Sequence, residues 1–99
     1  MVISVTTSSP APDQREQLAA FLAELLPRLE REPGVLAVYH YSDPETGEST
    51  TLVVWRDDAS RAAYRESALI REVMAFEERL GLRGTRRAFT LSYPPDANP

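Results

Sequence analysis

The sequence contains no cysteine and no lysine, and it has a single histidine, His40, among its 99 residues. Without cysteine, the chain has no disulfide, no thiolate zinc site and no cysteine nucleophile. Without lysine, it has no Schiff-base nucleophile, no pyridoxal phosphate anchor and no P-loop. One histidine is too few for a multi-histidine metal centre within one chain. We therefore expect chemistry that needs neither a metal ion nor a thiol nor a lysine, or no chemistry at all.

The charged residues are unevenly divided between the two signs. The chain has eleven arginines and fifteen acidic residues, which gives a net charge of −4. The arginines are dispersed, and Arg86-Arg87 is the one adjacent pair. An acidic protein without a basic stripe binds nucleic acid and anionic membranes poorly. Because no segment has the pattern of a signal peptide or a membrane span, we expect a cytoplasmic protein with neither nucleic acid nor membrane as a partner.

Alternating and β-branched apolar residues predict four strands. The second and third strands are separated by a polar turn that contains Asp43, Pro44 and Gly47, and together they form an antiparallel hairpin. The predicted strands span residues 2–7, 35–42, 50–55 and 87–93.

Apolar residues at three- and four-residue spacing predict two amphipathic helices between these strands. The first begins near an N-cap at Asp13, kinks or breaks at Pro27, and ends before Gly34. The second is capped by Asp58 or Ser60, and a glycine at position 81 or 84 ends it. The predicted inner face of the second helix consists of Ala63, Tyr64, Ser67, Ile70, Val73, Met74 and Leu80.

The order β-α-β-β-α-β over residues 1–93 is typical of the ferredoxin-like α+β fold, a four-stranded antiparallel sheet with two helices on one face. Residues 94–99 are expected to form a flexible tail behind this single domain. Strand alternation places Leu36 and His40 on one face of the sheet, and Val35 and Tyr39 on the other.

Both faces of the predicted sheet are therefore apolar. An exposed apolar face of this size is unfavourable in water, so we expect a homodimer that packs sheet against sheet as a dimeric α+β barrel. The alternative is a monomer whose sheet is twisted and partly hydrated.

Three side chains are candidates for a functional site. Trp55, the one tryptophan, either bounds a cavity for an aromatic ligand or closes the core. Tyr64 is expected under the second helix, where its hydroxyl binds either a ligand or a backbone carbonyl. His40 either acts as a general base toward a phenolic substrate or is a half-exposed strand residue. We interpret most arginines, and the acids of the second helix, as a solvated surface, although an arginine at a cavity mouth could hold a carboxylate or an enolate.

On these residues the sequence resembles the antibiotic biosynthesis monooxygenase (ABM) superfamily, small ferredoxin-like proteins that form dimeric α+β barrels. The resemblance covers about residues 2–93. It rests on Glu32-Pro33-Gly34-Val35-Leu36, on Tyr39-His40, and on Val54-Trp55 followed by acidic residues and a helix. It implies cofactor-independent oxidation of aromatic polyketide phenols to quinones by molecular oxygen, in a cavity between sheet and helices.

The resemblance also implies roles for single residues. Trp55 matches the pocket tryptophan of the quinone-forming members, whereas Thr51 stands where they have asparagine and Arg61 where they have tyrosine. Met74 falls where the haem-degrading members have their haem-ligating histidine, so haem degradation is not implied. The expected catalytic residues are Tyr64 and His40, and the expected substrate-binding residues are Trp55, Thr51, Arg61 and Met74.

The sequence thus predicts a cofactor-free monooxygenase that acts on an aromatic, polyketide-like phenol. Two alternatives from other classes remain. One is a non-catalytic small-molecule-binding or stress-response protein that uses the same cavity, and the other is a purely structural dimerisation module. A deep cavity lined by Tyr64 and Trp55 favours binding or catalysis, and a filled core favours the structural module.

Overall fold

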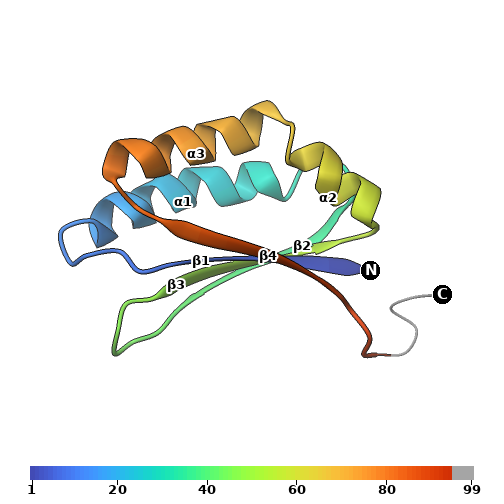
Figure 1. Ribbon diagram of the computed structural model, residues 1–99, viewed down its shortest axis with the longest axis horizontal. Helices are drawn as coiled ribbons and strands as arrows, with labels where there is room; N and C mark the ends of the chain where they lie inside the picture. The colour runs from blue at the N-terminus through green and yellow to red at the C-terminus, as the bar shows by residue number, and fades with distance from the viewer. Residues whose placement is uncertain (95–99) are drawn as a thin grey trace.

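Four antiparallel strands form one sheet in the order β2-β3-β1-β4 in the computed structural model, which describes residues 1–94 (Figure 1). Strand β1 (Val2–Ser8) lies between β3 (Ser49–Trp55) and β4 (Gly84–Thr90), and β2 (Val35–Ser42) lies at the edge beside β3. This order confirms the predicted ferredoxin-like α+β fold.

The predicted flexible tail at residues 94–99 lies, apart from Pro94, outside the described residues. No helix within residues 1–94 is long and apolar enough to cross a membrane.

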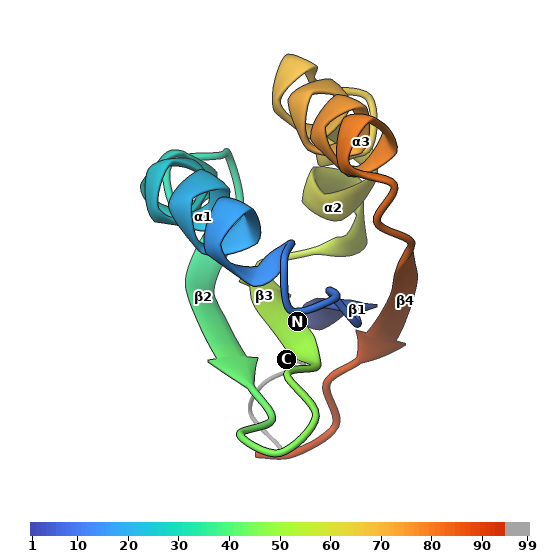
Figure 2. The ribbon, with the colours of Figure 1, turned by 90° about the vertical axis from the view of Figure 1, so that its left-hand side faces the viewer.

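All the helices that the structure describes cover the same face of the sheet (Figure 2). Helix α1 (Arg15–Leu29) lies above β2, whereas α2 (Asp58–Tyr64) and α3 (Ala68–Leu80) lie on the side of β4. The N-cap of α1 is Gln14 rather than Asp13. The helix continues through Pro27, so the predicted break there was wrong. Pro27 removes the one hydrogen bond that its backbone N–H would have made, and α1 ends two residues later at Leu29.

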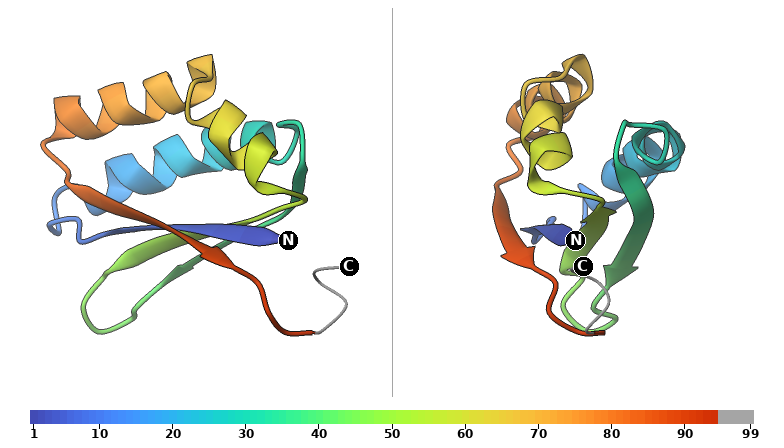
Figure 3. Two further views of the ribbon diagram at one scale, coloured as in Figure 1. Left: turned by 45° about the vertical axis from the view of Figure 1, so that its right-hand side comes forward. Right: turned by 90° about the vertical axis from the view of Figure 1, so that its right-hand side faces the viewer.

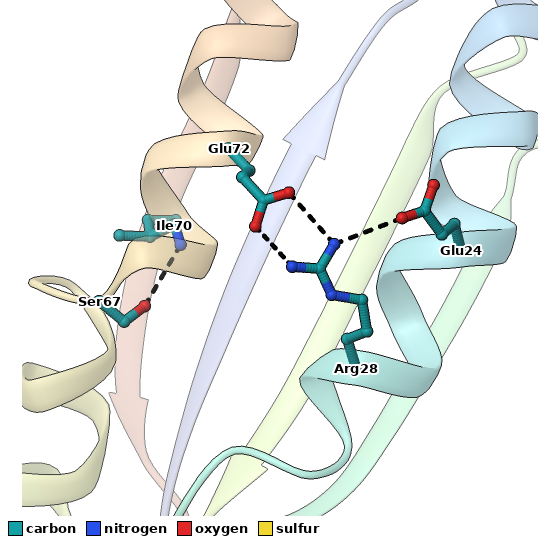
Figure 4. Close-up of polar contacts among 5 residues, drawn as sticks. All are labelled: Glu24, Arg28, Ser67, Ile70 and Glu72. Carbon is teal, nitrogen blue, oxygen red and sulfur yellow. Dashed lines mark hydrogen bonds and ion pairs between the residues drawn. The ribbon is translucent and has the colours of Figure 1, made fainter.

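The single helix predicted after Asp58 is in fact two helices. Asp57 caps α2, because its carboxylate accepts a hydrogen bond from the Ser60 backbone N–H at 2.8 Å. Ser67 caps α3 by accepting from the Ile70 backbone N–H at 3.3 Å (Figure 4). The Ser67 backbone is extended, with ψ at 163°, and it therefore separates α2 from α3 (Figure 3).

The end of α3 confirms one of the two predicted stop signals. Gly81 adopts a left-handed conformation with φ at 74°, which suits a residue without a side chain, and it caps the helix. Gly84 instead begins β4, so this strand spans Gly84–Thr90 rather than residues 87–93.

A β-bulge in β2 changes which residues face the helices. Val35 pairs with Trp55 and Ala37 pairs with Val54, which leaves Leu36 as the extra residue. Val35 consequently packs against the core below the helices, whereas Leu36 is 52% exposed. Strand alternation alone placed Val35 on the same face as Tyr39, away from this core. The bulge shifts the alternation by one residue and so turns Val35 toward the helices.

The core lies between the sheet and the helices. The Phe21 and Phe76 rings stack with centroids 4.0 Å apart, which joins α1 to α3. On the surface, Arg28 of α1 donates two hydrogen bonds to Glu72 of α3 and one to Glu24 (Figure 4). The buried apolar residues are Leu18, Leu25, Leu29, Val53, Trp55, Leu69, Ile70, Phe76 and Leu82.

The sheet face opposite the helices carries no covering layer within residues 1–94 (Figure 2). Its outer strands hold exposed aromatic residues, with exposed fractions of 59% for Tyr39, 54% for Tyr41 and 40% for Phe89. By the register of the sheet, the other apolar residues of this face are Ile3, Val5, Ala37, Leu52 and Val54.

Candidate functional site

A cavity of about 210 Å³ lies between the helices and the sheet. Helix α1 supplies an apolar roof, and alternate residues of β1 and β3 supply a floor of hydroxyl groups because they point toward the helices. The apolar lining consists of Leu18, Phe21, Leu22, Leu25, Leu29, Val53, Ile70, Val73, Phe76, Leu82 and Ala88, and the hydroxyl floor of Ser4, Thr6, Ser8, Ser49 and Thr51.

Tyr64, at the end of α2, lines this cavity. Its ring lies 5.3 Å from the Trp55 ring, tilted by 38°, and this contact fixes its position. Burial raises the pKa of Tyr64 to about 12, so the phenol is neutral and remains a hydrogen-bond donor. Within residues 1–94 its hydroxyl makes no hydrogen bond, and it is therefore available to a ligand.

Trp55 lies in the core beneath the cavity rather than on its wall. The residue is fully buried, and its indole Nε1 donates a hydrogen bond to the Ser4 hydroxyl at 2.9 Å. This position agrees with the core alternative for Trp55. Its effect on a ligand is indirect, because Tyr64 and Ser4, which both contact Trp55, line the cavity.

His40 lies on the helix-facing side of β2, beside the cavity. Its Nε2 atom is 2.8 Å from the Ser49 hydroxyl, and Ser49 is buried and lines the cavity floor. Desolvation lowers the pKa of His40, which favours the neutral ring at neutral pH. A role for His40 as a base would therefore act through Ser49, a residue that the sequence analysis did not single out.

The remaining predicted substrate-binding residues occupy different places. Thr51 belongs to the cavity floor, and Arg61 lines the cavity while pairing with Asp58 at 2.7 Å. Met74 is 48% exposed and does not line the cavity, so its predicted place on the inner face was wrong. Val73 takes the inner position, and successive helical residues point about 100° apart, which turns Met74 outward.

An ion pair between Arg86 of β4 and Glu77 of α3 also lines the cavity. Arg86 Nη2 donates to both carboxylate oxygens of Glu77, at 2.8 and 2.9 Å, and the two side chains are only 20% and 14% exposed. The sequence analysis placed Glu77 on a solvated surface. Its spacing of four residues from Val73, on the inner face of α3, was the available signal for a position facing the sheet.

The fold and the cavity together define a ferredoxin-like α+β protein with space for a small ligand between sheet and helices. The family model for antibiotic biosynthesis monooxygenases matches residues 1–75, and the chain belongs to this family. Membership supports a function of the general monooxygenase type. Among curated proteins, none matches the chain at a significant level.

Solved structures share the whole fold at low sequence identity. A Deinococcus radiodurans protein provisionally classed as an antibiotic biosynthesis monooxygenase has a TM-score of 0.86 and 17% identity, and the match covers 93% of each chain. A Nitrosomonas europaea protein of the same provisional class has a TM-score of 0.82 and 14% identity, covering 94% of this chain and 100% of that one. At these identities the likeness shows the fold alone.

Proposed function

We propose that the protein is a cytoplasmic, homodimeric, cofactor-independent monooxygenase that oxidises an aromatic phenol with molecular oxygen. The observation that supports this most is the free hydroxyl of Tyr64 in a cavity with an apolar roof and a hydroxyl floor. An apolar cavity with a few convergent polar groups suits a flat aromatic ligand whose oxygen must be held in place.

In the proposed reaction the substrate supplies all the electrons. A phenol loses the hydroxyl hydrogen and the ring hydrogen para to it, and that ring carbon gains one oxygen atom as a carbonyl. The second atom of O₂ leaves as water, so one O₂ is consumed and one quinone and one water are formed. Neither a bound metal nor a redox cofactor is needed to balance this reaction.

The protein's part is to bind the phenol and to move its proton. Tyr64 donates a hydrogen bond to a substrate oxygen, and its raised pKa keeps it a donor rather than a base. The Ser49 hydroxyl receives the phenolic proton while passing its own to the neutral His40 ring, 2.8 Å away. Thr51 and Arg61 contact the substrate from the floor and from α2, and Trp55 holds Tyr64.

A non-catalytic small-molecule binder is the second candidate, and two observations favour it. The indole N–H of Trp55 is occupied by Ser4, and His40 reaches the cavity only through Ser49. Fewer side chains of the cavity can therefore take part in the oxidation than can bind a ligand.

Oxygen consumption with a panel of anthrones and naphthols separates the two candidates. We expect turnover with one quinone formed per O₂, and a rate at least tenfold lower in Tyr64→Phe and His40→Ala. Tyr93→Phe is the matched control, because Tyr93 is 79% exposed, and it should retain the full rate. Binding without turnover for every compound would refute the monooxygenase and support the binder.

A further inference from the structure

The charge of the cavity is opposite in sign to that of the chain. Three arginines, Arg61, Arg65 and Arg86, line it together with one acid, Glu77, although acids outnumber arginines in the sequence. Arg87 also borders the cavity, but its guanidinium lies over the Phe89 ring on the opposite face of the sheet.

Pairing leaves one positive charge without a partner. Glu77 compensates Arg86, and Asp58 compensates Arg61 at 2.7 Å. Arg65, which caps the end of α2, has no acidic partner within residues 1–94. Arg65, an exposed residue, is therefore free to pair with one monoanion.

Arg86 has donors to spare for such an anion. Its contacts with Glu77 use Nη2 alone, and within residues 1–94 its Nε and Nη1 groups make no hydrogen bond. A guanidinium presents its N–H groups in a planar fork that matches a carboxylate. Arg86 and Arg65 act electrostatically on the Tyr64 hydroxyl, and Glu32 and Glu77 act on it with the opposite sign, which indicates that these charged groups surround the Tyr64 end of the cavity.

The size and lining of the cavity restrict the rest of the ligand. Its volume of about 210 Å³ lies below the usual range of roughly 300–1,000 Å³ for ligand pockets, so the ligand is compact. The roof is formed by leucines and by Phe21 and Phe76, which suit one or two aromatic rings.

We propose that the cavity takes a compact aromatic carboxylate, with the carboxylate on Arg86 and Tyr64 and the rings beneath α1. This inference rests on the proposed function only in taking the cavity as a ligand site. It requires no oxygen chemistry.

Calorimetric titration with 2-naphthoate and 2-naphthamide tests it, because the two probes share a shape and differ in charge. We expect naphthoate to bind at least tenfold more tightly at low salt, with the preference shrinking as salt is added. The key variant is the double substitution Glu77→Gln with Arg86→Gln, since removing both members of a buried pair is far milder than stranding one. It should abolish the preference by weakening naphthoate binding far more than naphthamide binding.

Two further variants make the result specific. Arg28→Gln with Glu72→Gln removes the ion pair between α1 and α3, outside this cavity, and it should keep the preference. Arg65→Gln, which breaks no ion pair, should reduce the preference and serves if the Glu77/Arg86 variant fails to fold.

Each remaining outcome has a defined meaning. Equal binding of the two probes by the wild type, or a preference that survives in the Glu77/Arg86 variant, would overturn this inference and leave the proposed oxidation standing. A clear naphthoate preference without turnover in the oxygen assay would overturn only the oxidation. If neither probe binds, this inference fails, and the oxygen assay alone decides the proposed oxidation.

Discussion

Two serine hydroxyls of the sheet, those of Ser4 and Ser49, each contact a neighbouring side chain and also line the cavity. Ser4 accepts the indole N–H of Trp55, so a polar group of a fully buried side chain is satisfied. The Ser49 hydroxyl is hydrogen-bonded to the His40 ring, 2.8 Å away. Both serines also line the cavity, and each therefore couples a residue outside the cavity to whatever binds inside it.

The lowered pKa of His40 predicts how stability changes with pH. Because the folded chain holds this proton less tightly than the unfolded chain, whose histidine titrates near 6.5, protonation favours unfolding. The free energy of unfolding should be highest above pH 6.5 and should decrease as the pH falls from there through the lowered pKa of the folded chain. Urea unfolding between pH 5 and 7.5 measures this, and the single histidine makes its contribution separable.

His40→Gln is the control, since glutamine can still bond to Ser49 but does not titrate. Its unfolding free energy should vary less between pH 6.5 and 5 than that of the wild type. A wild-type profile that matches the variant profile across this window would contradict the prediction.

Sequence patterns singled out Tyr64, which lines the cavity, but not the ion pair that lines it too. Trp55 stands out as the one tryptophan and Tyr64 as a large aromatic residue of the predicted helix, although Trp55 lies in the core and not on the cavity wall. Glu77 and Arg86 each resemble ordinary surface charges, and they become a pair only when α3 returns over β4. Such a contact depends on the tertiary structure, so local periodicity does not reveal it.

At the level of elements, the strand at residues 35–42 and the overall order were predicted correctly, because apolar runs and turn residues are local signals. The division between α2 and α3 was missed because apolar spacing continues across it. The actual signal was Ser67, whose hydroxyl caps α3 while its backbone is extended. The bulge at Leu36 was also missed, because a prediction from strict alternation assumes that no strand has an extra residue.

The contacts between α1 and α3 should contribute very unequally to stability. Phe76→Ala removes the ring stacked on Phe21 and leaves a hole in the core, for an expected loss of about 3–5 kcal/mol. The Arg28/Glu72 double glutamine variant removes an exposed ion pair and should leave the urea midpoint unchanged. Equilibrium urea unfolding with a constant m-value measures both. Equal losses in the two variants would show that burial does not dominate this helix contact.

At the scale of the whole molecule, the two faces of the sheet differ in what covers them. The helix-facing side holds the core and the cavity, whereas the other side presents the exposed rings of Tyr39, Tyr41 and Phe89. A contiguous apolar surface of this kind is typical of an interface between subunits. The same register that points the serines toward the cavity points these rings away from it.

We therefore predict that a second copy of the chain covers the open sheet face. The wild type should sediment at equilibrium with twice the chain mass at micromolar concentration, and Tyr39→Glu should sediment as a monomer, because it would bury a carboxylate in an apolar interface. Met74→Glu is the matched control, since Met74 is an exposed apolar residue on α3, and it should remain dimeric. A monomeric wild type would refute the dimer, and dissociation of both variants would show that the interface is not confined to the sheet.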